Sequence, residues 1–173
     1  MRLALLGIVA AVLLAGCGDS RTPAPPAGRI LAPAGFRDVS YPEAGIKLRA
    51  PDNWRIFQGT APQIATIASG DGQIAIWRYP RTEPLPVTQA QLKAARHALI
   101  AQVEIRDKTF RLTSSRIVVK PGLRGVELVG QATNEGERRF VRSLHAYEHG
   151  AEVVVDAFSP AADFARVDRE TFG

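Results

Sequence analysis

The most constraining feature of this chain is at its start, where an unbroken apolar run from Leu3 to Leu14 follows Met1-Arg2. A positive charge, an apolar run and then small residues are typical of an export signal. The run is shorter than the roughly 20 apolar residues that a membrane-spanning helix needs. A buried core helix is the alternative, but the Pro and Gly residues that follow would separate it from any domain. The folded part must therefore come from the rest of the chain.

The run ends in Leu14-Ala15-Gly16-Cys17, which resembles the lipobox of bacterial lipoproteins. The resemblance implies that the Cys17 thiol accepts a diacylglycerol group and that cleavage between Gly16 and Cys17 follows. Cys17 is the only cysteine, so no intrachain disulfide is possible, and acylation would remove a reactive free thiol. We expect residues 1–16 to be a signal peptide. We also expect lipidated Cys17 to hold the protein on the extracytoplasmic face of the cell membrane.

The segment after the cysteine is rich in Pro and Ala, with Pro23, Pro25, Pro26 and Pro33 among small and polar residues. Such a composition cannot bury enough apolar surface to order itself. Residues 17–35 are therefore predicted to be a lipidated Cys and a linker. Residues 36–173 have a common size for one domain, and they contain no internal repeat or second linker.

Alternating apolar residues and turn clusters predict a series of strands in this domain. Ser69-Gly70-Asp71-Gly72 is typical of a hairpin turn, because Gly supplies the positive φ that such turns need. Val153-Val154-Val155 is apolar on both faces, which favours a central strand. The predicted strands cover residues 45–50, 54–57, 63–68, 73–79, 110–119, 126–132, 138–147 and 151–158.

Two helices are predicted, and the first begins at a capping box. Thr88 and Gln91 can satisfy each other's free N–H groups, and a helical apolar stripe follows, so we expect a helix from about Gln89 to Ile105.

The second helix is predicted to begin with Ser159 as its N-cap and Pro160 in its first turn. Phe164, Val167 and Phe172 would then face the sheet.

The order strands, helix, meander, helix predicts an α+β fold in which helices pack on an antiparallel sheet. The run Gly45-Ile46, then Ala50-Pro51-Asp52-Asn53-Trp54, followed by this order of elements, resembles the PsbP-like fold, an α/β/α sandwich. The resemblance implies binding or assembly work rather than catalysis, and it implies no residue roles. It would continue a few residues further, so we expect either a slightly shortened chain or Gly173 as a helix C′ cap.

The histidines are the candidate metal ligands or catalytic groups. His145, Tyr147 and His149 would share one strand face, but residues four apart lie roughly 13 Å apart, too far for a pair of zinc ligands. They are interpreted as surface or hairpin-end histidines, and His97 as a solvated residue on the polar face of the helix. We expect no metal, no cofactor and no catalytic residue.

Two further patterns carry no chemistry. Ser114-Ser115 lack the Gly-x-Ser-x-Gly elbow of a hydrolase, and Gly70-Asp71-Gly72 is too short for a calcium loop.

The net charge is +5, with 18 Arg against 4 Lys. Arg suits bidentate contacts with phosphate or carboxylate, so anionic lipids or acidic wall polymers are possible partners, as is an envelope protein. A solvated charged surface is the alternative, and no nucleic acid is expected outside the cytoplasm. The leading hypothesis is a non-enzymatic binding or assembly module. An exported enzyme, such as a hydrolase, and a structural envelope protein remain alternatives.

Overall fold

The computed structural model describes residues 28–134 and 136–172. The predicted signal peptide, the cleavage site, the lipid attachment at Cys17 and the predicted cap at Gly173 lie outside these residues. Within the described ranges, no helix has the length and apolar character needed to cross a membrane.

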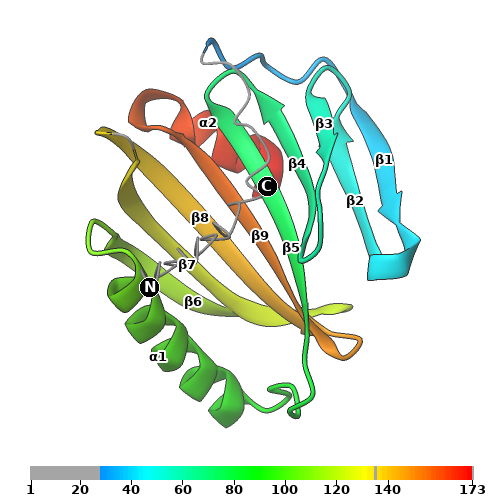
Figure 1. Cartoon of the computed structure of the whole chain (residues 1–173), viewed down its shortest axis with the longest axis vertical. Coiled ribbons are helices and arrows are strands. Elements are labelled where there is room, and N and C mark those ends of the chain that lie inside the picture. Colours follow the sequence, from blue (N-terminus) through cyan, green and yellow to red (C-terminus); the bar gives the residue numbers. More distant parts are fainter. Residues whose placement is uncertain (1–27, 135, 173) are drawn as a thin grey trace, which may run out of the picture.

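The described residues form two antiparallel sheets and two α-helices (Figure 1). A small sheet pairs β1 (Phe36–Tyr41) with β2 (Ile46–Pro51), joined by the 3-10 turn η1 (Pro42–Ala44). The large sheet has seven strands in the order β3-β4-β5-β9-β8-β7-β6. Its members are β3 (Arg55–Gln58), β4 (Gln63–Ser69), β5 (Gly72–Pro80), β6 (Arg111–Lys120), β7 (Leu123–Asn134), β8 (Glu137–Glu148) and β9 (Ala151–Pro160). The helices are α1 (Gln89–Arg106) and α2 (Ala161–Phe172). The α+β prediction is confirmed.

The first helix forms as its sequence predicts. The Thr88 side chain accepts a hydrogen bond from the Gln91 N–H at 3.2 Å, and Gln91 Oε1 accepts from the Thr88 N–H at 2.9 Å. This capping box satisfies N–H groups that would otherwise be unpaired. The apolar stripe of α1, which includes Leu92 and Leu99, packs with Val126 of β7 in one hydrophobic cluster. α1 therefore covers the β6–β7 side of one sheet face.

The second helix covers the opposite face and begins later than predicted. Strand β9 continues through Pro160, and α2 begins at Ala161. Ser159 is fully buried in the strand and pairs across from Phe140, so it is not the N-cap that the sequence predicts. Val167 is buried as expected, and Phe164 stacks at a tilt on Phe140 with ring centroids 5.2 Å apart.

A second hydrophobic cluster lies under α2 and the β1–β2 hairpin. Its buried members include Trp54, Ile67, Ile76 and Val167. Strand β1 has no counterpart among the predicted strands, and its Val39 packs on this cluster. The two clusters occupy opposite faces of the large sheet, as the helices do in Figure 1, so the domain is a sandwich with the sheet in the middle.

The domain begins earlier than the predicted boundary at Phe36. Ile30 is fully buried in the second cluster, although residues 17–35 are predicted to be linker. The main chain beside it is tied down, because the Leu31 N–H donates to Ser69 Oγ at 2.9 Å and Leu31 O accepts from Trp54 Nε1 at 3.1 Å. Gly70 permits this approach, since a Cβ there would lie 2.1 Å from the Gly28 carbonyl oxygen. Residues 28–35 therefore belong to the domain, because one apolar side chain and main-chain hydrogen bonds suffice to dock them.

Candidate functional site

An open cleft of about 820 Å³ lies on the α1 face of the large sheet. The second half of α1 forms one wall, and strands β5, β9 and β8 form the floor. Aromatic side chains and two arginines surround a row of polar groups in the floor. The lining side chains that carry the argument are Trp77, Tyr79, Arg81, Arg106, Ser143, His145, Glu152 and Asp156.

The tight turn between β8 and β9 brings the polar row together. His149 and Gly150 form a two-residue turn with φ of 49° and 68°, both in the left-handed region that a type I′ turn requires. The resulting register places Ser143 opposite Asp156 and His145 opposite Val154. Because side chains alternate along a strand, Ser143 and His145 of β8 and Glu152 and Asp156 of β9 all point to the α1 face.

The row is continuously hydrogen bonded. His145 Nδ1 lies 2.7 Å from Glu152 Oε1, and His145 Nε2 lies 3.1 Å from Ser143 Oγ. The Ser143 hydroxyl in turn bonds to the Asp156 carboxyl group. Arg81, just after β5, donates to the second oxygen of Glu152. A hydroxyl, an imidazole and two carboxyl groups from two strands are thus joined in one chain of contacts.

The two carboxyl groups of the row are shifted in opposite directions. Burial alone would raise the pKa of Glu152, but hydrogen bonds from His145 and Arg81 outweigh it, so the pKa lies below its usual value. Burial raises the pKa of Asp156, and the hydrogen bond from Ser143 and the charges of His145 and Arg106 only partly oppose this. Glu152 therefore loses its proton more readily than a free glutamate, whereas Asp156 holds its proton more tightly than a free aspartate.

One proton has two places along this row. An ionised Glu152 can only accept, so His145 Nδ1 donates to it. If Asp156 is ionised, Ser143 donates to it. If Asp156 is protonated, it can donate to Ser143 instead. The position of this proton changes which groups at the cleft floor can donate to a bound ligand.

His145 is a correction to the sequence interpretation. It was predicted to be a surface or hairpin-end histidine, but it is buried on β8, which pairs with β7 and β9 on its two sides. It does not share its strand face with His149, because His149 lies in the turn and is exposed. His97 is exposed on α1, as predicted.

The remaining predicted features lie away from the cleft. Ser114 and Ser115 are on edge strand β6, and residues 69–72 form the β4–β5 turn, as predicted. In residues 28–134 and 136–172, no group of three or more His, Cys, Asp or Glu side chains could hold a metal ion.

Sequence reasoning missed Ser143, Glu152, Asp156 and Arg81 as site residues. A usable signal was present for the first three, because the two-residue turn at His149-Gly150 sets the register of β8 against β9. Nothing local places Arg81 there, because its contact with Glu152 depends on the pairing of β5 with β9.

No protein-family model matches the chain, and no curated protein matches it in sequence. Solved structures do match. Cyanobacterial PsbP (CyanoP) from Synechocystis sp. PCC 6803 matches with a TM-score of 0.61 and 11% identity, over 79% of this chain and 87% of that chain. The fold is PsbP-like. PA94 from Pseudomonas aeruginosa, a protein of unknown function, matches with a TM-score of 0.50 and 17% identity, over 78% and 90% of the two chains.

LpqN of Mycobacterium tuberculosis, described as involved in cell envelope biogenesis, matches with a TM-score of 0.46 and 16% identity, over 69% and 73%. At these identities the likeness concerns the fold alone. The PsbP-like fold expected from the order of elements is thereby confirmed, and the chemistry must be argued from the cleft itself.

Proposed function

We propose that this chain is a membrane-anchored lipoprotein of the cell envelope whose PsbP-like domain binds a ligand without transforming it. The cleft beside α1 is the binding site. The observation that most supports this proposal is the Asp156 carboxyl group, whose pKa is raised by burial and which lies in the floor of an open cleft. A buried acid of this kind lowers the stability of the folded state, and a role in ligand binding would account for its presence.

The cleft suits a ligand with an apolar body and a polar edge. Trp77 and Tyr79 offer flat apolar surfaces, while Arg81 and Arg106 are donors that never lose their charge at physiological pH. The side chains at the floor supply both donors and acceptors. An acidic envelope polymer or an anionic partner segment has these properties and agrees with the excess of Arg over Lys.

Trp77 provides the test of binding. Fractions of the native envelope, titrated into the detergent-solubilised full chain, should change the emission of Trp77, and the active fraction identifies the ligand. The Trp77→Phe variant keeps Trp54, which is buried on the other face, and should lose the signal. Arg106→Ala should weaken binding about tenfold, because a charge-assisted hydrogen bond contributes about 1.5 kcal/mol or more. An emission change that survives in Trp77→Phe would count against the cleft.

The anchor rests on the sequence and is tested separately. Cys17→Ala should abolish incorporation of labelled fatty acid and release the domain from membranes. Ser20→Ala, three residues further along, should leave labelling unchanged. Lipid labelling that persists in Cys17→Ala would overturn the anchor and leave the cleft proposal standing.

A hydrolase is the second candidate, because Ser143, His145 and Glu152 form a hydroxyl, imidazole and carboxylate in hydrogen-bond contact. Two features oppose it. The Ser143 hydroxyl is also engaged by Asp156, and Ser143 lies on a strand paired on both sides, where main-chain N–H groups belong to the ladder rather than to an oxyanion hole.

A fluorophosphonate probe separates the two functions. Under the binding proposal, the purified protein and its Ser143→Ala variant should show the same background labelling. Labelling of the native protein at Ser143, absent from the variant and accompanied by ester hydrolysis, would replace the binding proposal by the hydrolase.

A further inference from the structure

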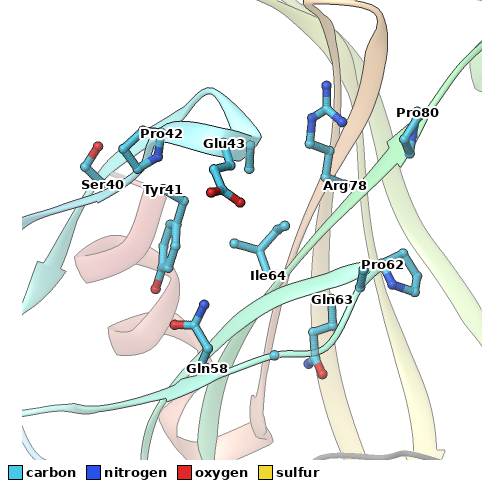
Figure 2. A pocket seen from close by; sticks show the side chains of 13 residues that line it. Ser40, Tyr41, Pro42, Glu43, Gln58, Pro62, Gln63, Ile64, Arg78 and Pro80 are labelled. Atoms are coloured by element: carbon cyan, nitrogen blue, oxygen red, sulfur yellow. The ribbon is translucent and has the colours of Figure 1, made fainter.

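A second cavity lies on the other face of the large sheet. It has a volume of about 1030 Å³, is open to solvent and is bordered by the end of β1, by η1, by the β3–β4 hairpin and by β5 (Figure 2). Strand β5 contributes to both cavities, because Trp77 and Tyr79 point to the α1 face and Arg78 points to this one. The sheet thus separates the two sites except at the end of β5, where Pro80 lines both.

The cavity wall is held by main-chain hydrogen bonds. Gly59 N–H donates to Ile64 O at 2.9 Å, and Arg78 N–H donates to Pro62 O at 2.9 Å. Gly59 is required at its position, since a Cβ there would lie 2.6 Å from the Gln63 carbonyl oxygen. The hairpin that forms one wall is therefore shaped before any ligand arrives.

Two polar atoms of the wall are buried and have no hydrogen-bond partner in the described part of the chain: the Tyr41 hydroxyl and Arg78 Nε. Burial also raises the pKa of Tyr41, with the Arg37 charge opposing it, so the hydroxyl stays a donor. Among residues 28–134 and 136–172, the Arg78 side chain makes one hydrogen bond, from Nη2 to His149 O, and it is 3.5 Å long. Unsatisfied buried donors are costly, and a ligand with an acceptor would remove that cost.

Glu43 and Arg78 are the two charged side chains among the lining residues. Figure 2 shows the Glu43 carboxylate and the Arg78 guanidinium on two sides of the cavity, with Ile64 below them in the view. Within the described residues, no ion pair joins them. Each charge therefore remains available to a ligand that enters the space.

The charges decide the class of ligand. A simple anion is attracted by Arg78 and repelled by Glu43, and a simple cation experiences the reverse. An uncharged apolar ligand would fit Ile64, Pro62 and Pro80 but would leave both charges without a partner. A molecule with a positive group at one end and a negative group at the other satisfies both sides.

We propose that this cavity binds a small zwitterion of amino-acid or short-peptide size, with its ammonium group at Glu43 and its carboxylate at Arg78. The Tyr41 hydroxyl donates a further hydrogen bond, and Ile64 with the two prolines contacts the apolar part. This site is independent of the cleft beside α1 and does not depend on what that cleft binds.

Alanyl-alanine is a suitable probe, measured by calorimetry on the detergent-solubilised full chain. N-acetylation removes its positive charge and C-amidation removes its negative charge. Each change should weaken binding at least about tenfold, because each removes a charge-assisted hydrogen bond. Each loss of affinity should depend on one side chain. In Glu43→Gln, N-acetylation of the peptide should not weaken binding further, and in Arg78→Gln, C-amidation should not weaken binding further.

Matched controls are Glu137→Gln and Arg138→Gln in the β7–β8 hairpin, where both residues are exposed. They should bind alanyl-alanine as the native protein does and keep both penalties. The comparison of the three peptides on the native protein needs no variant to fold. No saturable binding of alanyl-alanine, or equal binding of all three peptides, would overturn the proposal. Titration of Trp77 emission with envelope fractions would remain a separate result.

Discussion

Two buried carboxylates on opposite faces of the sheet are neutralised in different ways. On the α2 face, Glu127 of β7 accepts from Arg116 at 2.7 and 3.0 Å and from Arg142 at 2.7 Å. Arg142 also donates to Asp168 of α2 at 2.7 Å, so two carboxylates face two guanidinium groups. On the α1 face, Glu152 has Arg81 and His145, while its neighbour Asp156 is bonded to Ser143.

The difference separates a structural network from a candidate site. Guanidinium groups keep their charge at any pH a cell meets, so the network around Glu127 has a fixed charge balance and joins α2 to the sheet. The row around Glu152 contains a second carboxyl group, Asp156, whose pKa is raised by burial, and it borders a cleft. A proton can be moved along the row or lost when a ligand binds, whereas the charge of Arg142 cannot.

The largest expected effect is on the structural network. Glu127→Ala leaves Arg142 buried beside an empty position, so the free energy of unfolding should fall by about 3 kcal/mol in urea denaturation. Glu137→Ala, which removes the exposed partner of Arg139, should change it by less than about 1 kcal/mol. A loss in Glu127→Ala no greater than in this control would contradict the comparison.

Glu152→Ala should cost less, about 2 kcal/mol, because the Arg81 side chain is 45% exposed and can turn to water. The pKa of Glu152 is lowered in the folded state, so its contribution is present above the unfolded pKa of about 4.3 and is lost as the pH falls. The denaturation curves of the native protein and the variant should therefore differ at pH 7 and coincide at pH 3. Exposed Glu83→Ala, beside the same arginine, is the matched control, and a gap that persists at pH 3 would exclude this mechanism.

Asp156→Asn should have the opposite sign. Because burial raises the pKa of Asp156, the folded protein holds this proton more tightly than the unfolded chain, and native stability falls as the pH rises above about 3.9. The neutral amide removes that decline and should add about 1 kcal/mol at pH 7. Exposed Asp38→Asn should change nothing. An Asp156→Asn variant that is less stable than the native protein at pH 7 would show that the carboxylate is compensated after all.

The smallest effect is expected at the far end of the α2 network. In Asp168→Asn, Arg142 keeps Glu127 and the half-exposed position 168 is open to water, so the global loss should be about 0.5 kcal/mol. Hydrogen exchange should reveal it locally, with faster exchange in α2 and unchanged exchange in α1. Equal acceleration in both helices would mean that the network does not serve α2 in particular.

The elements whose interactions are local could be predicted from the sequence. The helix at 89–106 follows from a capping box and a stripe within five turns, and the β8–β9 hairpin follows from a two-residue turn. The order of elements that resembles the PsbP-like fold could be predicted as well. The predictions about Cys17 and the signal rest on the sequence as well, since those residues lie outside the described ranges.

Where these elements meet could not be predicted in this way, because it depends on contacts between distant segments. Periodicity predicts that Ser143 and His145 share a face, but not that α1 stops short of it and leaves a cleft. Arg81 reaches Glu152 because β5 pairs with β9, 71 residues further along the chain. Likewise, Glu43 and Arg78 face one cavity because the β1–β2 hairpin folds back over the second hydrophobic cluster. Local sequence encodes the direction of a side chain, whereas strand order and burial are set by contacts between distant segments, which no single segment specifies.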